Sequence, residues 1–138
     1  MTGGGWDARY AASDPGRPGP PTALVGRTQL LPGTGRALDV ACGRGTVAVW
    51  LARQGLAVDA VDAAPAGPRA RARLAAAEGV GVRWVEADLE QGLPAAGPYD
   101  VVVCQRYRDP ALYPALADAL APGGLLVVTV LSLSLIHI

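Results

Sequence analysis

The segment RALDVACGRG, residues 36–45, is the part of the sequence that decides the fold. A short apolar run carrying Asp39 passes into a turn bounded by Gly43 and Gly45, and a helical pattern begins at Thr46. Glycines tolerate a positive φ and let backbone N–H groups approach a ligand closely, and a helix N-terminus adds unpaired N–H groups and a partial positive charge. This arrangement is typical of a nucleotide-type cofactor site, although a G-x-G pair alone more often marks an ordinary turn.

From residue 36 onward, apolar runs alternate with helical patterns. Runs such as VVVC and LLVVTV are apolar on consecutive residues, which indicates strands covered on both faces. Parallel strands need crossover connections, and right-handed crossovers place helices on both faces of the sheet. We therefore predict an α/β fold with a doubly wound, mostly parallel Rossmann-like sheet of strand order 3-2-1-4-5. The expected strands are 37–41, 57–61, 82–86, 99–104 and 125–130, and the expected helices are 45–54, 65–77 and 110–120, with Pro122-Gly123-Gly124 as the stop.

Composition narrows the class of protein. The chain is 51% hydrophobic, which favours a globular domain, and its 12 basic and 12 acidic residues cancel, so we expect neither a nucleic-acid nor a membrane partner. The first residues show no secretion signal, and the longest apolar run, 125–131, is far shorter than the roughly 18 residues of a membrane span. We expect a cytoplasmic protein in which Cys42 and Cys104 stay reduced.

The two ends of the chain differ from the part between them. Residues 1–21 lack sustained periodicity and are interpreted as a mobile arm, and 22–31 as a short helical segment that completes an N-terminal region 1–35. The one His and all Ile residues fall within 136–138 of a chain otherwise rich in Ala, Gly, Pro and Arg. The final string LSLIHI resembles a translated transposon end used in preparing sequencing libraries. We therefore expect 132–138 to be a non-native tail, with a native strand end as the alternative.

Acidic side chains lie at the ends of three predicted strands. Asp39 precedes the glycine loop, Asp62 closes the second strand and Asp88 follows the third. Because the carboxyl ends of parallel strands meet at one edge of the sheet, we expect these residues and Cys104 to face one crevice. A carboxylate at the end of the second strand suits a ribose diol. Capping of the next helix is the alternative for Asp62, and capping within the loop is the alternative for Asp88.

Three runs in this order carry a resemblance to a known family: LDVACGRGTVAVWLARQGLAVDAVD at 38–62, EADLE at 86–90, and PYDVVVCQRYRDPALYPALADALAPGGLLVV at 98–128. They resemble class I S-adenosylmethionine-dependent methyltransferases, especially small bacterial members related to the tellurite-resistance and thiopurine enzymes. WDARY at 6–10 is similar to the N-terminal arm of that family. The resemblance implies S-adenosyl-L-methionine as cofactor and a small-molecule methyl acceptor, with no metal.

The resemblance also assigns roles to residues of this chain. It implies that Asp39 and the backbone of 41–45 hold the methionine part, that Asp62 binds the ribose hydroxyls, and that Asp88 with Leu89 contacts the adenine. Residues 104–106 would border the methyl-transfer site, and Trp6, Arg9 and Tyr10 would close over the cofactor, with Arg9 a candidate for the methionine carboxylate. The full expected cofactor-binding set is Asp39, Ala41, Cys42, Gly43, Gly45, Asp62, Ala63, Asp88, Leu89, Cys104, Arg9 and Trp6.

The sequence departs from the family pattern at two points. Ala41 stands where many members have the first glycine of the loop, which costs little if its φ stays negative. A complete member adds two further strands after the fifth, so we expect 36–131 to be an incomplete methyltransferase domain whose fifth strand has an exposed edge.

Methyl transfer from a sulfonium needs no acid, so much of the rate can come from positioning the donor and the acceptor. No His precedes the tail, and without an obvious general base we expect acceptors that are already nucleophilic, such as thiolates or reduced chalcogen oxyanions. Arg106 and Arg108 could attract such an anion or form a solvated loop face. Cys104 is interpreted as a small apolar residue, not a nucleophile, and no catalytic residue is assigned. An NAD(P)-dependent oxidoreductase fragment and an inactive, truncated cofactor-binding domain are the alternatives.

Overall fold

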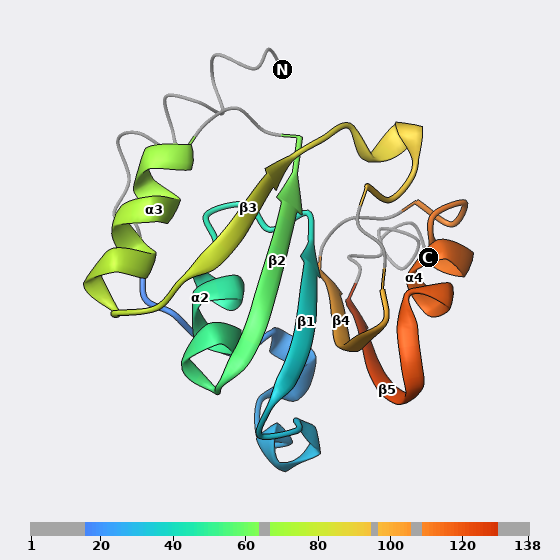
Figure 1. Cartoon of the computed structure of the whole chain (residues 1–138), viewed down its shortest axis with the longest axis horizontal. Helices are drawn as coiled ribbons and strands as arrows, with labels where there is room; N and C mark the ends of the chain where they lie inside the picture. The colour runs from blue at the N-terminus through green and yellow to red at the C-terminus, as the bar shows by residue number, and fades with distance from the viewer. Residues whose placement is uncertain (1–15, 64–66, 95–96, 106–108, 130–138) are drawn as a thin grey trace, which may run out of the picture.

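In the part of the chain that the structure describes, five parallel strands form one sheet in the order β3-β2-β1-β4-β5 (Figure 1). A computed structural model describes residues 16–63, 67–94, 97–105 and 109–129. The predicted fold class and strand order are confirmed. The strands are β1 (Gly35–Val40), β2 (Leu56–Asp62), β3 (Val82–Glu86), β4 (Tyr99–Gln105) and β5 (Leu120–Thr129); the helices are α2 (Thr46–Arg53), α3 (Pro68–Ala77) and α4 (Tyr113–Asp118), with 3-10 turns η1 (Thr22–Leu24), η2 (Thr28–Leu30) and η3 (Leu89–Gln91).

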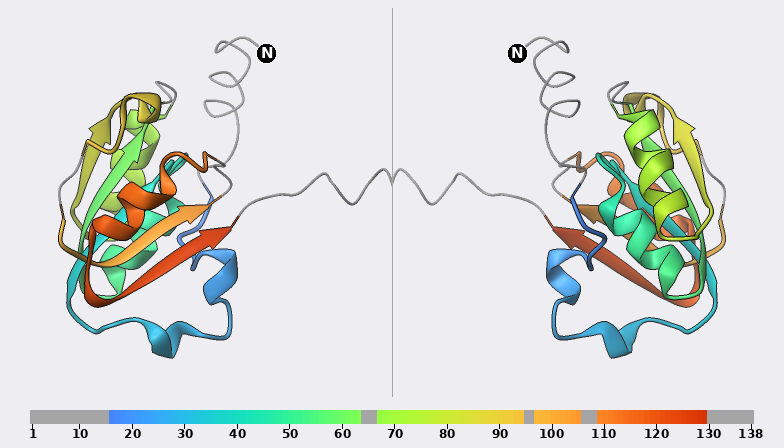
Figure 2. Two further views of the ribbon diagram at one scale, coloured as in Figure 1. Left: turned by 90° about the vertical axis from the view of Figure 1, so that its right-hand side faces the viewer. Right: turned by 90° about the vertical axis from the view of Figure 1, so that its left-hand side faces the viewer.

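The apolar strands are buried on both faces because alternate residues enter different clusters. Ala37 of β1 packs in one cluster with Leu51 of α2, whereas its neighbour Leu38 packs in a second cluster with Leu116 of α4. A third cluster joins α2 to Leu74 of α3. Thus α2 and α3 cover one face of the sheet and α4 covers part of the other, as the two side views in Figure 2 also show.

Three predicted boundaries were wrong. The last helix ends at Asp118, and β5 begins at Leu120, so Pro122-Gly123-Gly124 lies within the strand and not before it. An edge strand tolerates proline and an irregular register, and the pairing of β4 with β5 shifts between Tyr99 and Val101. In addition, α3 begins at Pro68, after the N-cap Gly67, instead of at 65.

Residues 16–21, which the sequence places in a mobile arm, pack against the domain. Pro21 is fully buried, and Leu24 is buried in the first core cluster. The Gly19 N–H donates to the Thr46 carbonyl at 3.3 Å, and the Thr22 N–H donates to Gln105 Oε1 at 2.8 Å. Residues 16–24 therefore pack across α2 and β4 as part of the domain. The predictions of a mobile arm for 1–15 and of a non-native tail for 132–138 concern segments outside the described residues.

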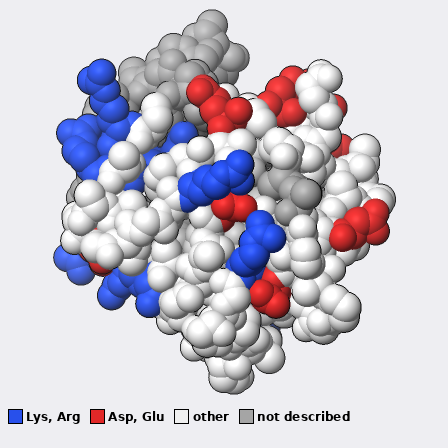
Figure 3. Space-filling view, in the orientation of Figure 1, with Lys and Arg blue, Asp and Glu red and all other residues white. Residues whose placement is uncertain are grey.

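Polar contacts join the amino-terminal parts of the strands, away from the glycine loop. The Tyr99 hydroxyl donates to Asp59 Oδ2 at 2.6 Å, and Arg36 and Arg83 each lie 3.5 Å from the same oxygen. Figure 3, in the orientation of Figure 1, shows basic side chains beside acidic ones near the middle of the visible face of the molecule. Burial, followed by the hydrogen bond to Asp59, raises the pKa of Tyr99 to about 12, which makes Tyr99 unsuitable as a base at neutral pH.

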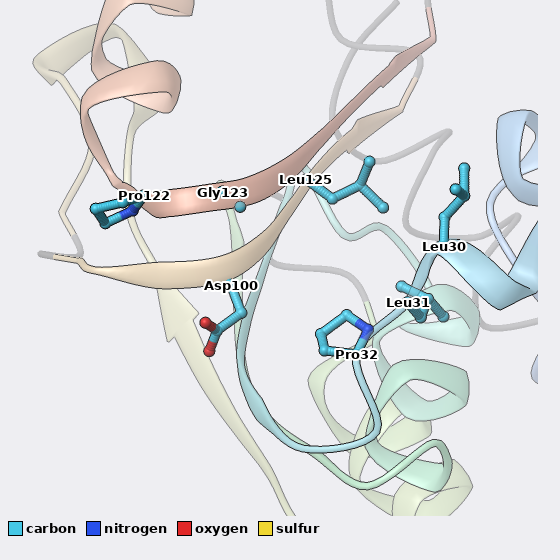
Figure 4. Close-up of a pocket in the computed structure, with 8 residues that line it drawn as sticks. Leu30, Leu31, Pro32, Asp100, Pro122, Gly123 and Leu125 are labelled. Atoms are coloured by element: carbon cyan, nitrogen blue, oxygen red, sulfur yellow. The ribbon is translucent and has the colours of Figure 1, made fainter.

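A cavity of about 220 Å³ lies at the same amino-terminal end, between the segment after η2 and the start of β5 (Figure 4). Its lining includes Leu31, Asp100 and Leu125. The Asp100 carboxylate accepts the Arg36 N–H at 2.9 Å, so it holds the start of β1 in place. The cavity is therefore at the opposite end of the sheet from the predicted crevice. Within the described residues, no helix is both long enough and apolar enough to cross a membrane.

Candidate cofactor site

The loop 41–45 leaves the carboxyl end of β1 in an unusual backbone conformation. Ala41, Gly43 and Gly45 have φ values of 61°, 55° and 84°, all in the left-handed region. The condition under which alanine would cost little at position 41, a negative φ, is not met: the loop has a conformation that costs a non-glycine residue about 1–2 kcal/mol. A Cβ added to Gly43 would meet no atom within 4 Å, so the loop is open there. Gly45, in contrast, lies against the Trp84 ring.

Asp62, at the end of β2, is joined to this loop by a hydrogen bond. Its Oδ2 accepts the Gly43 N–H at 2.5 Å, and the Cys42 N–H donates to the carbonyl of Val61 at 3.0 Å. The alternative in which Asp62 caps the next helix was wrong, because Gly67 is the N-cap of α3. The exposed Ala63 follows directly. Contact of Asp62 with a ribose stays a prediction.

Asp39 is the most unusual charged residue of the site. It is only 3% exposed, and burial, reinforced by the negative charge of Asp62, raises the pKa of Asp39 to about 8, while a hydrogen bond from the backbone of Ala48 opposes the shift. Among the described residues, Asp39 Oδ2 has no hydrogen-bond partner. A buried carboxylate oxygen without a partner is costly, and a cation or a hydrogen-bond donor from a ligand would relieve that cost.

Asp88 and Leu89 lie beyond the end of β3, the neighbour of β2. Asp88 Oδ1 accepts the Glu90 N–H at 2.9 Å, so Asp88 caps η3, as one of the two interpretations predicted. Leu89 is buried in the second core cluster. Its side chain therefore packs in the core near this edge of the sheet. Contact of Leu89 with an adenine stays a prediction.

The two cysteines are poor nucleophiles in this structure. Neither forms a disulfide. Burial and the nearby charge of Asp39 raise the pKa of Cys104 to about 11, and the same two causes raise the pKa of the half-buried Cys42 even further above its usual range. The Cys104 side chain is fully buried in the second core cluster, so only its backbone can border the crevice. The interpretation of Cys104 as a small apolar residue agrees with this packing.

One charged residue near the loop was missed in the sequence. Arg71 of α3 is 4% exposed, and its Nη1 donates to the Gly43 carbonyl at 3.1 Å. Its Cζ lies 5.5 Å from the centre of the Trp84 ring, within range of a cation–π contact. The spacing of Arg71 with the buried Leu74 and Ala75, three and four residues later, is the signal that could have placed it on the inner face of α3.

The structure thus brings Asp39, the 41–45 loop and Asp62 together at the carboxyl ends of β1 and β2. The predicted site residues Trp6 and Arg9 lie outside the described residues, as do Arg106 and Arg108. No cluster of potential metal ligands occurs in the described part of the chain.

The arrangement suits a ligand that is cationic near the loop. Two carboxylates stand close enough that one raises the pKa of the other, and one of them has a buried oxygen without a partner. The opening over Gly43 allows close approach to the backbone. An ammonium or a sulfonium group would favour the ionised form of Asp39 and gain from its charge and that of Asp62, whereas a pyrophosphate would meet repulsion from Asp62.

The chain belongs to the methyltransferase family, because the family model described as a methyltransferase domain matches residues 37–124. Among curated proteins, it is 39% identical over 106 residues to the ubiquinone biosynthesis O-methyltransferase of Caulobacter sp. (strain K31), covering 72% of this chain and 42% of that protein. The corresponding Xylella fastidiosa (strain 9a5c) protein is 36% identical over 145 residues, covering 98% of this chain and 57% of its own length. The chain therefore spans about half the length of the curated relatives it matches.

Solved structures agree with this assignment. A methyltransferase from Thiobacillus denitrificans, described as S-adenosylmethionine-dependent and bound to S-adenosyl-L-homocysteine, matches with a TM-score of 0.65 at 25% identity, covering 77% of this chain and 46% of that one. A Geobacter sulfurreducens methyltransferase matches with a TM-score of 0.71 at 20% identity over 89% of this chain and 53% of that one, which shows the shared fold. The predicted class I methyltransferase family is confirmed and is favoured over the oxidoreductase alternative. The narrower likeness to tellurite-resistance and thiopurine enzymes stays a prediction.

Proposed function

We propose that the whole protein transfers a methyl group from S-adenosyl-L-methionine to a small-molecule nucleophile in the cytoplasm. The observation that carries the proposal is Asp39, a buried carboxylate with an unpartnered oxygen beside a second carboxylate at the glycine loop. The family assignment and the S-adenosyl-L-homocysteine in the Thiobacillus denitrificans structure support it.

The charges at the loop distinguish this cofactor from a dinucleotide. NAD(P) would place two phosphate groups against the loop, close to Asp62, whose negative charge already raises the pKa of Asp39, and like charges at short range are unfavourable. S-adenosyl-L-methionine has no phosphate and carries a positive sulfonium and an ammonium group. The electrostatics of the loop therefore favour it over a nicotinamide cofactor.

The residues of the site fit the parts of the cofactor. Asp39 and the backbone of 41–45 would hold the aminoacyl end, Asp62 the ribose, and Asp88 the adenine. When bound, the cofactor supplies a methyl group on a positively charged sulfur, which an acceptor can attack directly. The protein's own contribution is to orient the two reactants and to exclude water, which can supply a large part of the acceleration. Cys104, with its raised pKa, takes no covalent part.

The acceptor is proposed by class only. The relatives from Caulobacter and Xylella are named O-methyltransferases, which favours an oxygen nucleophile on a small molecule. A phenol activated by a ring carbonyl is such a nucleophile, and it is acidic enough to react without a general base. Thiols, which the sequence favoured, form the second class to assay.

Binding and turnover test the proposal separately. Isothermal titration should show binding of S-adenosyl-L-homocysteine to the purified chain and none of NADH at equal concentration. The Asp39→Ala variant should weaken the binding, whereas Asp118→Ala, at an exposed position of α4, should leave it unchanged. Binding of NADH without binding of S-adenosyl-L-homocysteine would overturn the proposal.

Turnover distinguishes an enzyme from the alternative of an inactive cofactor-binding domain. Formation of S-adenosyl-L-homocysteine from S-adenosyl-L-methionine should depend on an added phenol or thiol. Because the chain spans about half the length of its relatives, the assay needs the full-length gene product as well as this chain. Binding without acceptor-dependent product in both proteins would favour the non-catalytic alternative.

A further inference from the structure

Arg71 is a buried arginine that the expected cofactor contacts do not use. Its guanidinium group lies between the Gly43 carbonyl and the Trp84 ring, and its side chain also approaches Gly45, where an added Cβ would lie 3.3 Å from Arg71 Cγ. Arg71 Nε is buried and has no partner among the described residues. Burying an arginine is costly unless its interactions compensate for the lost solvation. The contacts of Arg71 with the loop, including its hydrogen bond to the Gly43 carbonyl, compensate for part of this lost solvation.

Arg71 and Asp62 hold Gly43 from two sides. Asp62 accepts the Gly43 N–H, and Arg71 donates to the Gly43 carbonyl. These two groups belong to successive peptide units, so both units around Gly43 are oriented by side chains, one from β2 and one from α3. Because a trans peptide is planar, a carbonyl directed at Arg71 turns the N–H of the same unit, that of Arg44, away from α3.

Charge gives Arg71 a second connection to the site. The charges of Asp39 and Asp62 raise the pKa of Cys42, and the charge of Arg71 opposes them. Arg71, the one buried cation in the part of the chain that the structure describes, therefore opposes the charges of the two acidic groups at the loop. Removing it would change the field in the loop as well as the orientation of the Gly43–Arg44 peptide.

We propose that Arg71 is a positioning residue for the aminoacyl end of the cofactor. It acts through the loop, without touching the cofactor, by holding the Gly43–Arg44 peptide in the orientation that presents the Arg44 N–H on the side away from α3. This inference rests on the proposed function, in which the backbone of 41–45 binds the methionine part. It predicts that Arg71 matters for ligands that carry an aminoacyl tail and not for the nucleoside alone.

Two ligands and one matched variant separate this role from a merely structural one. S-adenosyl-L-homocysteine carries the aminoacyl tail, and 5′-methylthioadenosine has the same nucleoside and sulfur without it. Arg71→Met should weaken S-adenosyl-L-homocysteine binding about tenfold in calorimetry and change 5′-methylthioadenosine binding less than twofold. Arg73→Met, at an exposed arginine on the same helix, should change neither.

The outcomes are distinct. If Arg71→Met weakens both ligands equally, or neither, the positioning role is overturned. If neither the unsubstituted chain nor the full-length gene product binds either ligand, the proposed function itself fails. Far-UV circular dichroism and the unfolding midpoint show whether Arg71→Met folds. If it does not, Arg71→Lys, which keeps the charge and one donor for the Gly43 carbonyl, gives the same comparison. A selective loss for the tailed ligand of about threefold then supports the role, and equal changes overturn it.

Discussion

Replacing Asp39 with Asn should alter the pH dependence of stability. In the folded chain the pKa of Asp39 is raised to about 8, whereas an unfolded Asp titrates near 3.9. Between these values the folded state holds one proton more than the unfolded state, so stability falls as the pH rises, by up to about 1.4 kcal/mol per pH unit. From pH 5 to pH 7 the loss is about 2.7 kcal/mol. Asn cannot ionise, so the variant should lose far less over this range.

Urea unfolding at pH 5, 6 and 7, followed by circular dichroism, measures this difference. Asp118→Asn is the matched control, because Asp118 is exposed on α4, and its pH dependence should equal that of the unsubstituted chain. Asp39→Asn should also be the more stable protein at pH 7, while binding S-adenosyl-L-homocysteine more weakly. A stability profile of the same slope in Asp39→Asn and in the unsubstituted chain would refute the reasoning.

Three further results are expected. Ala41→Gly should stabilise the chain by about 0.5–1 kcal/mol in urea unfolding, since glycine relieves the left-handed strain and loses part of that gain to unfolded-state entropy; a loss of stability would contradict the φ of 61°. Gly45→Ala should destabilise by more than about 2 kcal/mol, because the new Cβ would lie 2.6 Å from the Trp84 ring at a φ of 84°, and an unchanged midpoint would argue against that contact. Iodoacetamide at pH 7.5 should alkylate Cys42 and Cys104 slowly in the native chain and readily in urea, since their pKa values are raised by burial; rapid native labelling of Cys104 would contradict its packing.

The sheet could be predicted from the sequence because its signals are local and repeated. Consecutive apolar residues in 101–104 indicate a strand covered on both faces, and the crossovers that parallel strands require indicate a doubly wound sheet. Asp62 could be placed at the end of β2 because the strand ends where its apolar run ends. Those inferences need only periodicity and the rules for connecting parallel strands.

The details that were wrong depend on contacts distant in sequence. The φ of Ala41 is set by hydrogen bonds that join the loop to β2, and an alanine gives no local sign of them. Arg71 does not stand out from the other arginines of its helix in the sequence, although its partners are Gly43 and Trp84. The start of β5 depends on pairing with Tyr99, which overrides the usual preference of proline and glycine for turns.

The packing of residues 16–24 changes where this domain can be shortened or joined to another protein. A boundary at residue 36, where the glycine-loop strand begins in the sequence pattern, would remove Pro21 and Leu24 and leave part of the α2 side of the sheet uncovered. It would also leave Gln105 without the Thr22 N–H. A fusion partner or an affinity label is therefore best attached before Gly16, so that the covering segment is kept whole.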